Sequence, residues 1–155
     1  MGLFSKKIKL VAPMTGKLVD ITEVEDITFS QKFLGDGVAI KPTEGTVVSP
    51  VEGKIIQVFH TKHALGINVK GVEILIHIGM NTVELKGKGF EVFVKEGKKV
   101  NAGDKLVEVD LNYLEENGYP TETPVVITNM EEIKGLEKKT GDVVAGKTEI
   151  MEIKK

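Results

Sequence analysis

The sequence contains neither cysteine nor arginine. Without cysteine there is no disulfide framework, no thiolate nucleophile and no cysteine-type zinc site, and we expect the protein to work in the reducing cytoplasm. Without arginine the chain lacks the planar fork that reads guanine and grips phosphate at two points, which disfavours a nucleotide-binding or DNA-reading surface. The 21 lysines nearly balance the 23 acidic residues, for a net charge of -2. No strong field attracts nucleic acid, and we expect no nucleic-acid partner.

Long apolar runs are also missing. The richest stretch, Ile74 to Met80, is interrupted by His77 and falls far short of a membrane span. The start of the chain, Met1 to Lys9, has too few large apolar residues for a signal-peptide core, so we expect no direct membrane insertion. With 155 residues the chain has the size of one domain, and we expect a single domain over residues 1–155 in which residues 1–7 form a flexible tail.

Glycine, by contrast, is abundant, and its 17 copies separate short runs rich in valine and isoleucine. This pattern is typical of many short strands joined by tight turns. It predicts an all-β fold, an antiparallel β-sandwich or barrel with one or two short helical turns. The expected strands are Lys9 to Val11, Gly16 to Asp20, Gly37 to Pro42, Thr46 to Ser49, Gly53 to Val58, Ala64 to Asn68, Glu73 to Ile78, Glu91 to Val94, Lys105 to Asp110, Pro124 to Ile127 and Glu149 to Ile153.

Two positions have the character of helix caps. Asp110 is expected to cap a helical turn that runs through Asn117 and stops at Gly118, because a short acidic side chain accepts from the first free backbone N–H groups. Asn129, with Glu132 three residues later, forms the spacing of a capping pair. We expect a second, shorter helical turn there.

The chain also contains an internal repeat. The segment Val11 to Ile21 reappears 37 residues later as Val48 to Val58, with proline, glycine and lysine in register. Each copy predicts a strand that enters through proline, turns at glycine and leaves as a second strand, so that two similar hairpins face each other across one core. A second, weaker repeat relates Gly97–Gly103 to Gly141–Gly146. The fold is therefore expected to be pseudo-symmetric.

The candidate chemistry rests on histidine. His77 interrupts an apolar strand, a place where a lone histidine is more often structural than catalytic. His63 lies just past a strand, and the 13 residues between the two histidines suit a short hairpin that returns through Lys70-Gly71. Such a hairpin brings both imidazoles to the same edge of the sheet. Thr61 shares a face with His63 if the strand extends that far.

Two imidazoles and a hydroxyl at one site are compatible with three kinds of chemistry. Zinc binding could recruit His60, but an odd separation on a strand points His60 and His63 to opposite faces. Nucleophilic catalysis by a serine triad lacks its Gly-x-Ser-x-Gly elbow. Phosphoryl carriage needs only a neutral imidazole as nucleophile, with the second histidine, the hydroxyl and backbone N–H groups to steady the charge. This third use needs no metal, nucleotide or deep pocket.

One motif points elsewhere, because Gly141 to Thr148 satisfies the formula of a phosphate-binding P-loop letter by letter. Such a loop needs a buried strand before it and a helix after it, whose N-terminus faces the anion. Only seven residues follow Thr148, and they have the pattern of a final strand. We interpret the match as a glycine-rich turn.

Several motifs in order resemble a known family. They are Gly35 to Pro42, Thr61 to Ala64, His77 to Gly87 and Thr123 to Met130. They are similar to those of the glucose-specific IIA component of the bacterial phosphoenolpyruvate-dependent sugar phosphotransferase system, from about Ile8 to the C-terminus.

The resemblance implies a β-sandwich phosphotransferase component that forms a phosphohistidine, has no sugar-binding site of its own and needs no cofactor or resident metal. It would accept a phosphoryl group from the phosphocarrier HPr and pass it to a cysteine of the IIB domain of a glucose-type permease. His77 matches the histidine that is phosphorylated at Nε2. His63 matches the histidine that hydrogen-bonds the phosphoryl group, and Thr61 matches the threonine that orients an imidazole.

The resemblance also implies a docking surface around the nucleophile. Asp26, Phe29 and Phe59 fall on positions of the active-site rim and docking patch, and Asn81 stands where relatives often carry aspartate. One acidic group near the phosphoryl is then missing, which would alter the kinetics of transfer. Two alternatives remain open at this point, a zinc-dependent hydrolase on a similar β scaffold and a biotinyl or lipoyl carrier. The glycine-spaced hairpin at Glu96 to Leu106 resembles those carrier domains, although no carrier-lysine motif is present.

Overall fold

The structure is a computed structural model that describes residues 7–155. Most of the expected tail, residues 1–6, lies outside the described part, whereas Lys7 begins the first strand. The strands are β1 (Lys7–Val11), β2 (Gly16–Asp20), β3 (Asp36–Pro42), β4 (Thr46–Val48), β5 (Gly53–Val58), β6 (Ala64–Val69), β7 (Val72–His77), β8 (Phe90–Val92), β9 (Lys99–Val100), β10 (Lys105–Val109), β11 (Thr123–Ile127), β12 (Gly135–Lys138), β13 (Gly141–Val143) and β14 (Glu149–Lys154). The short helices are η2 (Ile21–Glu23), α1 (Ile27–Ser30), η3 (Thr82–Leu85), α2 (Leu111–Glu116) and η4 (Met130–Glu132). No helix in this part of the chain is long and apolar enough to cross a membrane.

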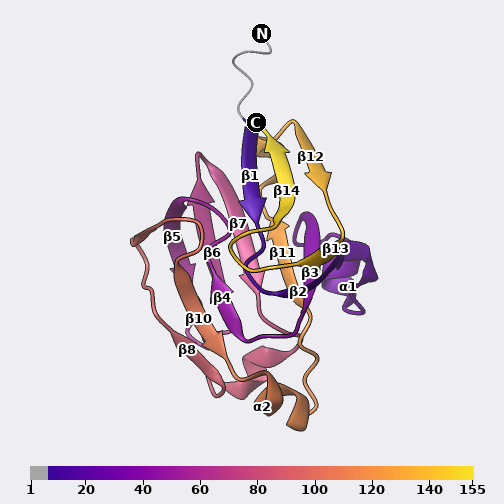
Figure 1. The fold of residues 1–155 in the computed structure, drawn as a ribbon, viewed down its shortest axis with the longest axis vertical. Coiled ribbons are helices and arrows are strands. Elements are labelled where there is room, and N and C mark those ends of the chain that lie inside the picture. The colour runs from indigo at the N-terminus through magenta and orange to yellow at the C-terminus, as the bar shows by residue number, and fades with distance from the viewer. Residues whose placement is uncertain (1–6) are drawn as a thin grey trace.

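The strands form three sheets, and all recorded strand pairs are antiparallel. The large sheet has the order β13-β2-β3-β11-β7-β6-β5-β9, and the two small sheets have the orders β1-β14-β12 and β4-β10-β8. Figure 1 shows β1, β14 and β12 at one end of the molecule, and β8, β10 and α2 at the other. The predicted all-β, antiparallel fold is confirmed.

The internal repeat is visible as reciprocal hydrogen bonds between the two proline turns. The backbone N–H of Val11 donates to the carbonyl of Pro50 at 2.9 Å, and the equivalent N–H of Val48 donates to the carbonyl of Pro13 at 2.8 Å. Each copy continues through its glycine into a strand, β2 in the first and β5 in the second. The two equivalent turns are therefore present, but the expected hairpins were wrong, because each turn leads from a small sheet into the large one and its two strands do not pair with each other.

The pseudo-symmetry extends through the whole sheet. Its strand order is matched from both ends, with β13 corresponding to β9, β2 to β5, β3 to β6 and β11 to β7. The second, weaker repeat obeys the same relation, since the N–H of Gly146 donates to the carbonyl of Ala12 and that of Gly103 donates to the carbonyl of Ser49. One unit, β4 to β10, is continuous in sequence. The other unit, β1 to β3 with β11 to β14, flanks it.

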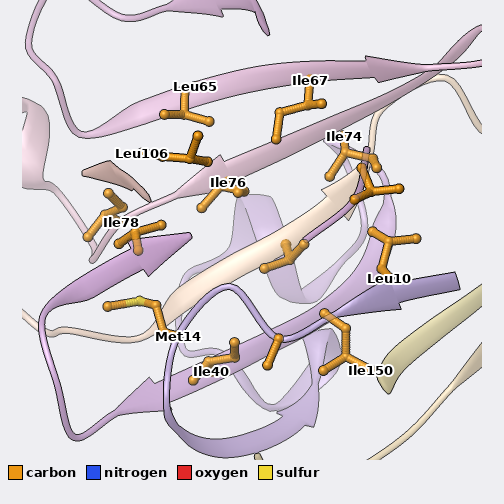
Figure 2. Close-up of a cluster of buried hydrophobic side chains, with 14 of the residues drawn as sticks. Leu10, Met14, Ile40, Leu65, Ile67, Ile74, Ile76, Ile78, Leu106 and Ile150 are labelled. Atoms are coloured by element: carbon orange, nitrogen blue, oxygen red, sulfur yellow. The ribbon is translucent and has the colours of Figure 1, made fainter. Parts of the chain in front are cut away.

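Most large apolar side chains pack between the sheets. Figure 2 shows Leu65, Ile67, Ile74 and Ile76 of the β6–β7 hairpin in one cluster with Leu10, Met14, Ile40, Leu106 and Ile150. In β7 the buried side chains alternate, so that Leu75 and His77 lie on the other face of the sheet. That second face has its own small core, in which Leu75 packs against Val19, Ile21, Val24, Phe29, Ala39, Met80 and Val126. The segment between β2 and β3 therefore covers the face from which His77 projects.

The two helical expectations had different outcomes. Asp110 caps α2 as predicted, because its carboxylate accepts from the N–H of Tyr113 at 3.0 Å. The short helical turn expected at Asn129 is present as η4, but the side-chain capping role of Asn129 was wrong. Its side chain makes no cap bond to η4; it accepts from the N–H of Glu73 and donates to the carbonyl of Gly71 instead, both at 2.8 Å. This amide ties β7 to the loop after β11.

Candidate functional site

The β6–β7 hairpin places the two histidines side by side. Lys70 and Gly71 form its turn with left-handed φ angles of 51° and 87°, the conformation that a two-residue hairpin loop requires. Ala64 pairs with His77 across the ladder, and the N–H of Ile78 donates to the carbonyl of His63 at 2.7 Å. The imidazole centroids are 4.8 Å apart with planes at 82°. The predicted juxtaposition of His63 and His77 is confirmed.

The His77 ring is held in one tautomer. Its Nδ1 lies 2.8 Å from the carbonyl oxygen of Gly79, and because a carbonyl only accepts, Nδ1 must carry the proton. The neutral ring then has its lone pair at Nε2. Burial lowers the pKa of His77 below its usual value, although the bond to the Gly79 carbonyl and the charge of Asp26 oppose this shift. The neutral, nucleophilic form is therefore favoured at pH 7.

Gly79 occupies a tightly constrained position in the loop after His77. Its φ is 75°, and an added Cβ would lie 2.7 Å from Cγ2 of Thr82 and 2.9 Å from the carbonyl oxygen of Pro120. The loop is fixed from both sides, since the N–H of Met80 donates to Pro120 and the buried hydroxyl of Thr82 donates to the carbonyl of Ile78. Only glycine meets both the conformational and the steric demand.

We expect Gly79→Ala to destabilise the protein by about 3 kcal/mol, because left-handed strain and a clash with backbone add together. Gly97→Ala is the matched control: Gly97 has a φ of 91°, but nothing lies within 4 Å of its added Cβ. The control should cost only about 1 kcal/mol. Urea unfolding of both variants measures the difference. Equal losses would show that the Thr82 and Pro120 contacts do not constrain the loop.

His63 is buried, with 4% of its surface exposed. The hydroxyl of Thr61 lies 2.7 Å from its Nδ1. Thr61 reaches this position from a turn and not from the expected strand extension, because Lys62 takes a left-handed φ of 65° and donates its N–H to the carbonyl of Phe59. Burial, together with repulsion from His77, lowers the pKa of His63 from 6.5 to about 4.

This depressed pKa makes stability depend on pH. Between pH 6.5 and about 4 the unfolded chain binds a proton that native His63 does not, so stability is full above pH 6.5 and falls as pH falls toward 4. The loss should approach about 3 kcal/mol from this residue. Urea unfolding at pH 7, 6 and 5 should therefore show a shallower pH dependence for His63→Gln than for the wild type. His60→Gln, which removes an exposed histidine, should keep the wild-type slope. Parallel slopes in all three proteins would contradict the shift.

Two phenylalanines frame the imidazoles edge to face. Phe29 lies 5.0 Å from the His77 ring centroid and Phe59 lies 5.5 Å from that of His63. Phe29 is only 4% exposed, so it forms a wall of the site and offers little surface for docking. Phe59 is half-buried. These rings exclude water from one side of each imidazole.

The two polar residues expected at the rim have local structural roles. Asp26 caps α1, since its carboxylate accepts from the N–H of Thr28 at 2.8 Å, and its negative charge acts on His77. Asn81 is exposed and has a left-handed φ of 59°, a conformation that asparagine tolerates better than most residues. Its side chain makes no cap bond to η3. Both residues lie on segments that bound the histidine pair.

Four exposed apolar side chains lie in or near these segments. Phe33 is 73% and Ile27 66% exposed, and Leu34 and Val83 are exposed as well. Ile27 belongs to α1, the helix that carries Phe29, and Val83 follows Asn81 in η3. Little in the sequence indicates that these side chains are exposed, because α1 is only four residues long and shows no periodicity. Ile27, Phe33 and Leu34 lie in the segment that carries Phe29, the neighbour of the His77 ring, and Val83 lies in the loop after β7. We call these four side chains the apolar rim, because exposed apolar side chains suit contact with another protein.

The arrangement can supply nucleophilic chemistry at one nitrogen. Nε2 of His77 carries the free lone pair, and the imidazole of His63 lies beside the His77 ring. No group of three or more histidine, cysteine, aspartate or glutamate side chains among residues 7–155 is arranged to hold a metal ion, and His60 is exposed. In the glycine-rich turn of Gly141–Thr148, the N–H groups of Val144 and Ala145 bond to the hydroxyls of Thr148 and Thr15. These groups are therefore already engaged within the protein and do not cradle a phosphate.

Known proteins resemble the chain over nearly its whole length. A family model described as the phosphoenolpyruvate-dependent sugar phosphotransferase system, EIIA 1, matches residues 8–133. The glucose-specific EIIA component of Bacillus anthracis is 48% identical, with 99% of this chain and 94% of the relative covered. That of Haemophilus influenzae is 42% identical with both chains fully covered.

Two further matches extend the comparison. The N-acetylglucosamine-specific EIICBA component of Escherichia coli is 46% identical over 95% of this chain, which spans 23% of that protein. Among solved structures, the glucose permease IIA of Mycoplasma capricolum matches with a TM-score of 0.89 and 44% identity, covering 96% of this chain and 97% of the other. The sequence comparison and the fold comparison thus identify the same kind of protein, a IIA component.

Proposed function

The chain belongs to the EIIA 1 family of the phosphoenolpyruvate-dependent sugar phosphotransferase system, and from this premise we propose that His77 is the residue that carries the phosphoryl group. The protein is a phosphotransferase component that passes phosphate to the IIB domain of a sugar permease and so supports sugar uptake. Neither the zinc hydrolase nor the biotinyl or lipoyl carrier is supported by these relatives.

The observation that supports His77 is its fixed tautomer. The Gly79 carbonyl accepts from Nδ1, which leaves Nε2 unprotonated in the neutral ring, and burial disfavours the charged form. A neutral imidazole nitrogen with a free lone pair is the nucleophile that phosphoryl transfer requires. His63 has a depressed pKa but a different environment, because its Nδ1 faces a hydroxyl and not a carbonyl.

We propose that the donor is phosphorylated HPr and that both transfers occur in the cytoplasm. The N–P bond of the donor breaks as the bond from Nε2 of His77 to phosphorus forms, and the electron pair returns to the donor nitrogen. When the Thr61 hydroxyl donates to Nδ1 of His63, the remaining proton of that ring lies on Nε2 and can donate to a phosphoryl oxygen. In the second step a cysteine of the IIB domain attacks phosphorus and His77 leaves as the neutral imidazole.

Labelled phosphoenolpyruvate, enzyme I and HPr provide the direct test. We expect one acid-labile, alkali-stable label per chain, which peptide mapping assigns to His77. Omission of HPr should abolish labelling, and addition of the IIB domain should discharge it. A label on another residue would overturn the assignment of His77, and labelling without HPr would overturn the assignment of the donor.

A further inference from the structure

A second concave feature lies away from the histidines. It is an open groove of about 770 Å³ between the start of β1, the turn before β5, the β6–β7 turn and the segment after β9. Its lining contains five lysines and one acidic residue, namely Lys7, Lys9, Lys54, Lys70, Lys99 and Glu52. The lining charge of about +4 contrasts with the net charge of -2 of the whole chain. Positive charge is thus concentrated in this groove.

Little of this charge is neutralised by neighbouring carboxylates. Lys7 approaches Glu152 at 3.7 Å and Lys9 approaches Glu149 at 3.9 Å, and exposed pairs at such distances contribute little. Glu149 is also engaged by Lys139 at 2.6 Å. No ion pair within residues 7–155 involves the other three lysines of the groove. Five lysines therefore border the groove with little compensation of their charge.

The groove also offers a defined floor and neutral donors. Ile8, Val51, Val69 and Val100 line it and are almost fully buried, and so form a rigid apolar base under the lysine stems. The amides of Asn68 and Asn101 stand in its walls. An apolar base with convergent charged and amide groups is the usual composition of a small-molecule site.

The location separates this groove from the carrier chemistry. Asn68 and Lys70 lie at the turn end of the β6–β7 hairpin, whereas His63 and His77 lie at its open end. Five residues of strand span about 17 Å. A ligand in the groove would leave the histidines and the apolar rim free, so neither the transfer step nor docking there accounts for the cluster of lysines.

We propose that the groove binds a small phosphate-bearing anion, such as a phosphate monoester. Such a group carries about two negative charges and several strong acceptor oxygens, which several ammonium groups and amides can satisfy together. A singly charged carboxylate would offset only one of these positive charges, whereas a phosphate monoester offsets about two. The concave form favours a small ligand over a flat membrane surface, because the floor lies below the surrounding surface.

NMR titration of the full chain with glucose 6-phosphate, phosphoenolpyruvate and inorganic phosphate tests the proposal. We expect saturable shifts at groove residues for at least one of these probes, weakened by added salt. The double variant Lys54→Gln/Lys99→Gln should bind roughly tenfold more weakly, because two charged contacts are lost. Lys17→Gln/Lys41→Gln has the same net charge but alters two exposed lysines outside the groove, and it should bind as the wild type does.

Two other outcomes would overturn the proposal. One is the absence of saturable shifts with all three probes, including the case in which the protein sediments only with phosphatidylglycerol vesicles, which would indicate a membrane-facing surface. The other is equal weakening in both double variants, which would indicate a diffuse charge effect. Labelling of His77 in the groove variant at the wild-type rate would keep this result independent of the carrier function.

Discussion

Replacing His77 with alanine is expected to abolish phosphoryl transfer through the protein, with a loss of at least about a thousandfold in the rate of labelling by phosphorylated HPr. The substitution removes the imidazole whose Nε2 keeps a free lone pair because its Nδ1 bonds to the Gly79 carbonyl. We expect no replacement by the neighbouring imidazole of His63, because that ring is oriented through a hydroxyl and its centroid lies 4.8 Å from that of His77.

His60→Ala is the matched control, since it removes an exposed histidine from the adjacent turn. Rapid-quench labelling with phosphoenolpyruvate, enzyme I and HPr compares the three proteins, and circular dichroism verifies that each is folded. The control should label at the wild-type rate. If His77→Ala retained a full equivalent of label, the nucleophile would have to be sought elsewhere in the chain.

His63→Gln is expected to separate the two half-reactions. The glutamine amide keeps one N–H donor near the phosphoryl group, so labelling at His77 should persist. It lacks the rigid ring that packs against Phe59 and is oriented by Thr61, so the donor is no longer held where charge develops as the phosphoryl leaves. We expect onward transfer to the IIB domain to slow by about a hundredfold, the usual effect of losing one oriented donor.

Single-turnover discharge of the purified phosphoprotein by the IIB domain measures this effect without interference from the first step. His60→Gln makes the same chemical change at an exposed position and should discharge at the wild-type rate. Discharge of His63→Gln at that same rate would reduce His63 to a packing residue. Loss of labelling in this variant would place its contribution in the first step instead.

Much of the architecture follows from local sequence patterns. The repeated proline, glycine and lysine predicted two equivalent turns, because the same backbone geometry demands the same residues. The strands that were not expected, β9, β12 and β13, have two to four residues each. Strands of this length carry too little alternation to be recognised, and they form because a neighbouring strand offers its hydrogen bonds. The predicted capping by Asn129 was wrong for a related reason, since backbone groups of β7 and of the turn before it bind its side-chain amide instead.

The candidate site was predictable where it depends on one hairpin. The spacing of His63 and His77 with a glycine-containing turn between them determines their pairing, and this is local information. The cover over His77 is different, because Phe29 reaches it from a one-turn helix in the segment between β2 and β3. That contact joins segments about fifty residues apart, and neither periodicity nor a turn signal encodes it. The exposure of Phe33 and Ile27 likewise depends on how this segment lies on the sheet.

Because of the pseudo-twofold arrangement, the chain resembles a homodimer whose two subunits are joined in one polypeptide. Both histidines come from the continuous unit, β4 to β10, whereas the Phe29 wall comes from the flanking unit. In the ladders Ala64 pairs with His77 and, at the related position, Gly37 pairs with Val126. The continuous unit therefore has a histidine at this position, and the flanking unit has the aliphatic side chain of Val126 there. On the proposed role of His77, a true dimer of such halves would carry two nucleophiles, whereas this chain carries one, beside the Phe29 wall that the flanking unit supplies.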